Sequence, residues 1–296
     1  MPVMVEQDSE NGSPRKPRES TRAKTTRRGI LAAFGGLGLG TAAAALGGSG
    51  SVVTADAESA GPTRGAPSCV LAPEQMEGPY YLDYRILRED ITEDRRGSGL
   101  LLDIVVVDAV DCSPLPGIAV DVWHCDALGV YSSYTGYGND ETPPLDEDGH
   151  APPTDDTTWL RGVRLTDSEG VASFRSIVPG WYQGRTVHIH VKTITGGHRS
   201  DGVWEGGHTS HTGQLYFPES FNSHLARLWP YSGNTVPRTT NERDLLYDSG
   251  DEGPMTLLDL EPAPPPFPPG TTRARVVLGI DPTATPPPEG MPERAR

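Results

Sequence analysis

The spacing of apolar residues argues against a helical fold for most of this chain. After Glu58, no run of ten or more residues repeats its apolar positions with the helical period, and the best short candidate is residues 221–228. Short apolar or alternating runs, separated by Gly and Pro turns, are found instead. This pattern predicts an all-β protein with an antiparallel β-sandwich core, long functional loops and little helix.

The expected strands are residues 100–110, 118–125, 159–166, 170–177, 186–193, 213–217 and 273–280. The first of them is nearly all apolar, which indicates a strand that is central or buried on both faces. Because only a turn separates the first two strands, we expect them to form an antiparallel pair. Residues 126–156 form a Gly-, Pro- and Asp-rich loop that is too long to be idle in a compact domain.

The N-terminal 57 residues are expected to be an export signal with a basic N-terminus. Residues 15–28 are basic and end in Arg27 and Arg28, and a weakly apolar run continues to Gly48. Twin arginines before such a run resemble a twin-arginine (Tat) signal, which would send the protein to the cell envelope or outside the cell. The glycines of this run make it a poor bilayer span, so no stable membrane insertion is expected.

The rest of the chain divides into a linker at residues 58–68, a β-sandwich domain at residues 69–281 and a Pro-rich, disordered tail at residues 282–296. Residues 1–57 hold seven of the 25 Lys and Arg and five of the 40 Asp and Glu, so the remainder has a net charge of about −17. This charge argues against a nucleic-acid partner and favours neutral or weakly charged small substrates.

Three cysteines, Cys69, Cys112 and Cys125, lie in the expected domain. Outside the cytoplasm, one disulfide and one free or buried thiol are expected. The sequence does not determine which two cysteines pair.

Two histidines on an expected strand are candidate metal ligands. His188 and His190 are two residues apart, so a strand projects both imidazoles from the same face. Such a pair can chelate a transition metal. Tyr182 lies six residues earlier, after a turn marked by Pro179 and Gly180, and its phenol can approach the same metal.

Four segments, in order along the chain, resemble motifs of the intradiol ring-cleavage dioxygenases. They are EGPYY at residues 77–81, VWHCDALGVYS at 122–132, PGWYQGRTVHIH at 179–190 and TGQLYF at 212–217. The resemblance extends from about Cys69 to Phe217 and, more loosely, to the strand at residues 273–280.

The resemblance implies one non-haem Fe(III) per chain, held by Tyr131, Tyr182, His188 and His190. Ferric iron is a hard cation that prefers anionic oxygen, and a bound metal lowers the phenol pKa from about 10 so that phenolate forms. Imidazole is also a good ligand for iron.

The same resemblance implies roles for further residues. Arg185 would stabilise negative charge that develops on the substrate ring, and Gln214 would orient solvent or an oxygen intermediate. Tyr182 would also serve as a base, and Tyr80 and Tyr81 would line the substrate pocket. The implied reaction is cleavage of a catechol-type diol by O₂ to a cis,cis-muconate-type dicarboxylate in aromatic catabolism.

One departure from the family leaves the substrate open. Five residues separate Tyr182 from His188, whereas the well-known cytoplasmic members have a longer loop there. We therefore expect a more open pocket, compatible with catechol, protocatechuate, hydroxyquinol or larger lignin-derived catechols. The oligomeric state is open too, and a homodimer is compatible with the sequence.

Other histidines and one cysteine are not expected to be ligands. His124 and Cys125 are neighbours on a strand, so at most one points to the site. His198, His208 and His211 lie in a Gly-rich stretch and are expected to be exposed.

Two other classes of function remain to be weighed. Residues 114–120 resemble the strand and turn of transthyretin-like and carboxypeptidase-regulatory-like sandwiches, which are binding or structural modules. His188 and His190 alone would also suit an exported Zn- or Cu-binding protein, although tyrosines are poor ligands for both metals. Fold does not decide among these functions, whereas the tyrosines and histidines favour the dioxygenase.

Overall fold

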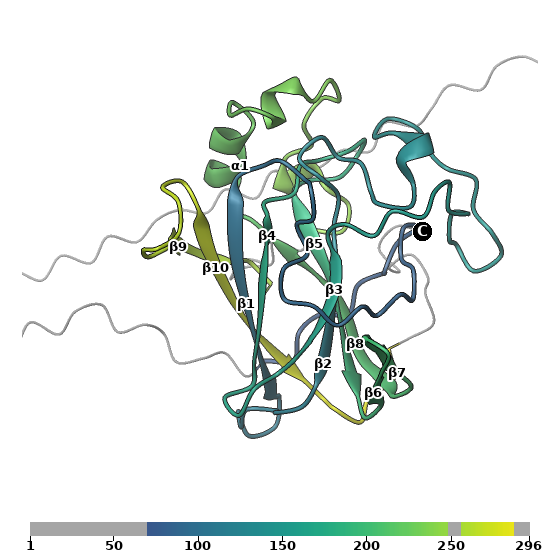
Figure 1. The fold of residues 1–296 in the computed structure, drawn as a ribbon, viewed down its shortest axis with the longest axis vertical. Coiled ribbons are helices and arrows are strands. Elements are labelled where there is room, and N and C mark those ends of the chain that lie inside the picture. The colour runs from purple at the N-terminus through teal and green to yellow at the C-terminus, as the bar shows by residue number, and fades with distance from the viewer. Residues whose placement is uncertain (1–69, 248–255, 287–296) are drawn as a thin grey trace, which may run out of the picture. The chain divides into compact units, whose positions relative to one another are not determined.

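The computed structural model describes residues 70–247 and 256–286 (Figure 1). The expected export signal and linker, Cys69, and the last ten residues of the expected tail lie outside these ranges. No helix within the described ranges is long and apolar enough to cross a bilayer.

Two four-stranded sheets form the domain, which confirms the predicted all-β class. In the order of the strands, the first sheet consists of β4 (Val171–Ile177), β1 (Gly99–Asp108), β10 (Thr272–Ile280) and β9 (Asp259–Pro262). The second consists of β3 (Arg161–Leu165), β2 (Ala119–Trp123), β5 (His188–Thr195) and β8 (His208–Tyr216). A hairpin of β6 (His198–Ser200) and β7 (Val203–Glu205) forms a small third sheet.

One apolar core lies between the two large sheets. From the first sheet, β1 contributes Leu102 and Ile104, and from the second, β2 contributes Val122 and β5 contributes Ile189 and Val191. Successive side chains on a strand alternate between faces. The side chains that alternate with these core residues on β2 and β5 therefore project from the outer face of the second sheet.

The expected pairing of the first two strands is wrong. β1 pairs with β4 in antiparallel and with β10 in parallel orientation, whereas β2 pairs with β3 and β5. The short connection after β1 crosses from one sheet to the other, so the two apolar strands contribute to the same core from opposite sheets. A parallel β1–β10 pair is possible because a long stretch of chain connects the two strands.

Helical structure is confined to short segments in the described chain. The helix α1 (Glu219–Leu225) lies within three residues of the expected position. It begins directly after Pro218, which suits a helix start because proline lacks the N–H that would be unpaired there. Three 3₁₀ turns complete this set: η1 (Thr135–Tyr137), η2 (Tyr231–Gly233) and η3 (Asn241–Arg243).

The cysteines agree with the expected disulfide and buried thiol. Cys112 is in a disulfide bond, and Cys125 is a buried free thiol.

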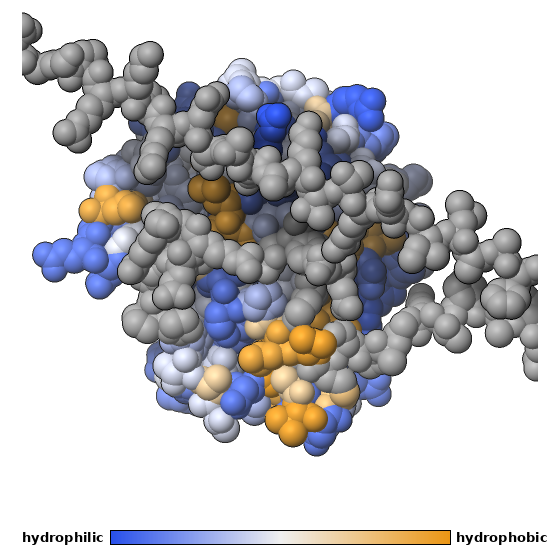
Figure 2. Space-filling view, turned by 180° about the vertical axis from the view of Figure 1, so that it is seen from behind, coloured by the Kyte–Doolittle hydropathy of each residue, from blue (hydrophilic) through white to orange (hydrophobic). Residues whose placement is uncertain are grey.

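On the face shown in Figure 2, apolar residues form separate patches in a mainly hydrophilic surface. Scattered apolar residues are normal on a folded protein, so they do not by themselves indicate a binding face.

Candidate metal centre

Strand β5 presents two imidazoles on the outer face of the second sheet. His188 and His190 alternate with the core residues Ile189 and Val191, and both imidazoles are nearly fully buried. Their Nε2 atoms are 3.2 Å apart. The structure therefore brings the two histidines together, as their spacing predicts.

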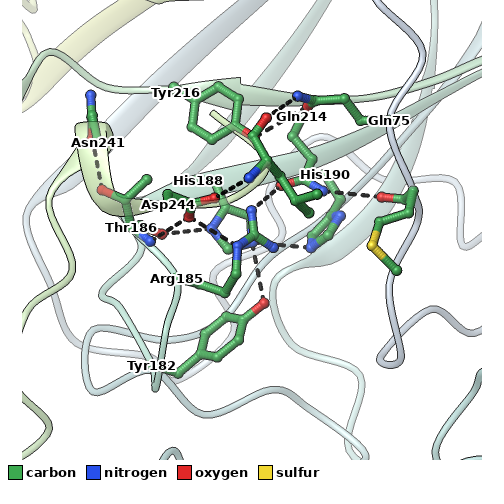
Figure 3. Close-up of polar contacts among 12 residues, drawn as sticks. Gln75, Tyr182, Arg185, Thr186, His188, His190, Gln214, Tyr216, Asn241 and Asp244 are labelled. Atoms are coloured by element: carbon green, nitrogen blue, oxygen red, sulfur yellow. Dashed lines mark hydrogen bonds and ion pairs between the residues drawn. The ribbon is translucent and has the colours of Figure 1, made fainter. Parts of the chain in front are cut away.

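Two phenols approach the same pair of nitrogens from loops. The Tyr131 hydroxyl oxygen lies 3.1 Å from His190 Nε2 and 3.5 Å from His188 Nε2. The Tyr182 hydroxyl oxygen lies 3.4 Å from His188 Nε2. Figure 3 shows the Tyr182 hydroxyl directed toward the histidines. All four residues that the resemblance names thus converge on one point.

These separations fit a shared metal ion. Two ligand atoms that are each about 2.1 Å from one ion, at an angle of 90–120°, lie about 3.0–3.6 Å apart. His188 Nδ1 lies 2.6 Å from the Thr186 carbonyl oxygen and can donate a proton to it, which leaves a lone pair on Nε2 for the metal. Within the described ranges, no group of three or more His, Cys, Asp or Glu is placed to bind a metal, so binding here depends on the tyrosines.

Burial favours the neutral form of all four donors. It raises the pKa of Tyr131 well above its usual value, and it also raises the pKa of Tyr182, although Arg185 acts in the opposite direction. Burial also lowers the pKa of His188 and His190 well below the usual value, so each imidazole can offer a lone pair near neutral pH. A bound metal would supply the positive charge that stabilises both phenolates.

The ring of His190 is held by aromatic stacking. The indole of Trp123, from β2, lies parallel to the imidazole at an angle of 8° and a centroid separation of 4.9 Å. β2 and β5 are neighbours, and Trp123 is paired directly with His190 in their register. The second sheet therefore fixes this candidate ligand from the adjacent strand.

Arg185 lies beside the four donors in a network of buried polar groups. Its Nε donates to Asp244 Oδ2 at 2.9 Å, and its Nη2 donates to Gln214 Oε1. Gln214 is fully buried, and its Nε2 donates to the Met76 carbonyl oxygen at 3.0 Å. Burial alone would lower the pKa of Arg185, but Tyr182 and Asp244 raise it, so the guanidinium stays charged.

Sequence reasoning did not identify Asp244. This residue follows η3 and lies beyond the stretch that carries the resemblance, in a segment without strand or helix periodicity. No local signal marked it, because only the folded chain brings it to Arg185.

The two expected pocket tyrosines are placed differently. The ring of Tyr80 stacks on Tyr131 at 4.6 Å between centroids and meets Tyr182 edge-on at 6.0 Å. Tyr81 instead packs against Trp123 and donates to Asp121 Oδ2 at 3.3 Å. Tyr80 therefore borders two of the candidate ligands, whereas Tyr81 packs on Trp123, which in turn stacks on His190.

Residues that were not expected to be ligands lie outside the cluster of four candidate donors. His124 is buried, with Nε2 2.8 Å from the Ser176 hydroxyl oxygen, and Cys125 packs in an aromatic cluster that includes Tyr80 and Tyr131. The expectation that His211 is exposed is wrong: β8 begins five residues before the strand predicted there, so His211 is buried and its Nδ1 lies 2.6 Å from Glu74 Oε1.

The chain is similar in sequence to known dioxygenases. A family model described as Dioxygenase matches residues 76–226. Catechol 1,2-dioxygenase from Acinetobacter baylyi is 26% identical over 150 residues, which cover 43% of this chain and 43% of that protein. The chain thus matches less than half the length of this curated relative.

A solved structure resembles the fold over a larger share of the chain. The intradiol ring-cleavage dioxygenase from Tetranychus urticae is 29% identical, with a TM-score of 0.61. The match covers 73% of this chain and 97% of that one.

Proposed function

The chain belongs to the intradiol ring-cleavage dioxygenase family, and we propose that it opens the ring of a catechol-type diol with O₂ between the two hydroxylated carbons. The product would be a cis,cis-muconate-type dicarboxylate. The observation that carries this proposal is the convergence of two phenol oxygens and two imidazole nitrogens, at separations of 3.1–3.5 Å, beside the largely buried Arg185.

The cofactor we propose is one non-haem Fe(III) per chain, with Tyr131, Tyr182, His188 and His190 as its ligands. Two phenolates would offset two of its three charges, which favours ferric iron over divalent zinc or copper. When bound, the iron would withdraw electron density from the diol and so make its ring reactive toward O₂.

The residues around the donors suit a planar, electron-rich substrate. Tyr182 carries an oxygen that can take up a proton from a substrate hydroxyl. Arg185 supplies a fixed positive charge that can stabilise negative charge developing on the ring, and Gln214 and Asp244 hold its guanidinium. Tyr80, already stacked on Tyr131, provides an aromatic wall.

Non-catalytic alternatives account for less of the site. A transthyretin-like binding module has no need for two phenols and an arginine at a pair of buried histidines. A zinc- or copper-binding protein would use the histidines but not the tyrosines. We also propose that the protein acts outside the cytoplasm, on the basis of the sequence of residues 1–57 alone.

The first test is the metal and the colour of the purified protein. We expect about one iron per chain and a red to burgundy colour from phenolate-to-iron charge transfer. A colourless protein that contains zinc, and that stays inactive after loading with iron, would overturn the proposal.

The second test is the product formed from catechol and O₂. Intradiol cleavage gives a colourless muconate that absorbs in the ultraviolet and carries both atoms of labelled O₂. A yellow semialdehyde would mean extradiol cleavage and would contradict the proposed reaction, even if iron were present. Protocatechuate, hydroxyquinol and larger lignin-derived catechols form the comparison panel, because the short connection between Tyr182 and His188 leaves the substrate open.

A further inference from the structure

Asp244 is a buried carboxylate that contacts both Arg185 and the residue after it. Its Oδ2 accepts a hydrogen bond from Arg185 Nε at 2.9 Å and another from the backbone N–H of Thr186, the next residue, at 2.7 Å. The Asp244 side chain is 0% exposed. One carboxylate oxygen therefore fixes both the side chain of Arg185 and the backbone that follows it.

The turn that carries Asp244 is anchored to three other parts of the chain. Asn241, at the start of η3, accepts from the Thr186 hydroxyl at 2.7 Å and donates through Nδ2 to the Phe217 carbonyl oxygen at 2.9 Å. Its backbone N–H donates to Glu219 Oε2, on α1, at 3.0 Å. These contacts set the position of Asp244 without involving any of the four metal-ligand candidates.

The guanidinium of Arg185 is fixed at two of its three nitrogens. Nε is held by Asp244, and Nη2 is held by Gln214, while Nη1 has no hydrogen-bond partner among the described residues. Because the guanidinium is planar, two fixed nitrogens also fix the direction of the third. Figure 3 shows Asp244 and Gln214 meeting at Arg185, next to the two histidines.

We propose that Asp244 is a positioning residue, which orients the Arg185 guanidinium for the reaction through the Nε hydrogen bond. This inference rests on the proposed function, because Arg185 is the residue that would act on the substrate. The negative charge of Asp244 also matters, because Arg185 is a largely buried cation beside a site that we expect to hold another cation. Without that carboxylate, the guanidinium should turn away from Gln214.

Asp244→Asn tests the proposal, because it keeps the size of the side chain and removes its charge. We expect kcat to fall about ten- to hundredfold, as for a small misplacement of a catalytic group, while KM changes less than about threefold. Iron content and the visible absorption band should match those of the wild type. The matched control is Glu242→Gln, which removes one charge from the same turn at an exposed position and should leave kcat unchanged.

A double-mutant cycle separates positioning from a structural role. If Asp244 acts through Arg185, then adding Asp244→Asn to Arg185→Ala should cost less than about twofold in kcat beyond Arg185→Ala alone. An equal loss in both backgrounds would overturn the proposal. So would an Asp244→Asn enzyme with the turnover of the Glu242→Gln control.

A crystal structure of the iron-loaded Asp244→Asn protein tests the inference without turnover. We expect the hydrogen bond between Arg185 and Gln214 to be lost, and an unmoved Arg185 would overturn the proposal. This readout holds even if the wild type cleaves no diol, a result that would count against the proposed function alone. If Asp244→Asn does not fold, Asp244→Glu keeps the charge but displaces the carboxylate by one methylene; full kcat in that variant would refute positioning.

Discussion

At the scale of single residues, the candidate ligands differ in the contacts that fix their side chains. The His188 ring is oriented by the Thr186 carbonyl oxygen. His190 Nδ1 is buried and has no hydrogen-bond partner among the described residues, and its ring is held by stacking on Trp123. Tyr131 is held between the ring of Tyr80 and the two imidazoles. Each candidate ligand can therefore be altered separately.

Tyr131→Phe should abolish or strongly shift the red colour and lower the iron content, because it removes one of two phenolate donors. The measurement is iron per chain together with the visible spectrum. The matched control is Tyr137→Phe, which removes the same atom from a half-buried tyrosine in the same loop, where the hydroxyl donates to the Pro152 carbonyl oxygen and not to a candidate ligand. Equal iron content and colour in both variants would argue against Tyr131 as a ligand.

His124 makes a contribution to stability that depends on pH. Burial lowers its pKa to about 4, whereas the pKa in the unfolded chain is near 6.5. As pH falls from 6.5 to 4, the unfolded chain takes up a proton that the folded protein does not, so the free energy of unfolding falls, by up to about 3 kcal/mol. Above pH 6.5, this contribution is constant.

The test is the free energy of unfolding of the wild type and of His124→Gln as a function of pH. The glutamine can still contact the Ser176 hydroxyl, but it does not titrate, so the loss of stability between pH 6.5 and pH 4 should be smaller. His198→Gln, at an exposed position, is the control and should keep the slope of the wild type. Identical slopes in all three proteins would contradict a neutral, buried His124.

The residues of the site were predictable to different degrees. The motif resemblance named the four donors, Arg185 and Gln214, because they lie in short segments with a fixed spacing. It did not reach Asp244, which is 59 positions from Arg185 and meets it only through the path of the folded chain. Local spacing carries no information about such a contact.

At the scale of elements, strands were easier to predict than their partners. β3, β4, β5 and β10 begin and end within about two residues of the predicted strands, because alternation and Gly or Pro turns are local signals. The pairing of β1 was not predictable in this way. Its neighbour β10 is far along the chain, and a short connection to β2 is compatible with either one sheet or two.

The turn before Tyr131 is packed too closely to admit a side chain. Gly129 has a φ of +89°, and a Cβ there would lie 2.1 Å from the Trp181 carbonyl oxygen. Gly129 lies two residues before Tyr131, and Trp181 directly precedes Tyr182. This glycine therefore allows the two loops that carry the phenols to approach each other.

Gly129→Ala should force these two loops apart and lower the free energy of unfolding by more than about 2 kcal/mol, because the clash adds to the strain of a positive φ. Iron content should fall with it. The control is Gly149→Ala. This glycine has a φ of +87°, but apart from its chain neighbours no described residue has an atom within 4 Å of the added Cβ, so the change should cost only about 1–2 kcal/mol and keep the iron. Equal effects of the two variants would show that the close contact between these two loops determines neither the free energy of unfolding nor the iron content.

At the scale of the whole molecule, the sandwich serves as a platform and the connections complete the site. The histidines lie on the outer face of the second sheet, and the loop of residues 126–156 is tied to the segment before Tyr80 by the hydrogen bond from Ala151 N–H to the Pro79 carbonyl oxygen, at 2.9 Å. The C-terminal segment around Asp244 adds the support of Arg185. The site therefore depends on parts of the chain that are folded together, not on one strand alone.

This dependence bears on the proposed export. The proposed metal site is assembled from β5, the loop of residues 126–156 and the segment around Asp244, so it would exist only in the folded protein. Loading it with iron in the cytoplasm would require folding before export. The twin-arginine route carries folded proteins, which fits the Arg27–Arg28 pair.

Replacing both Arg27 and Arg28 with lysine should keep the precursor inside the cell, whereas Arg15→Lys together with Arg18→Lys, in the same basic stretch, should not. The measurement is the fraction of protein outside the cytoplasm and its iron content. In a strain that lacks the twin-arginine pathway, mature protein found outside the cells would contradict the proposed route. The chain would then have crossed the membrane by another export pathway.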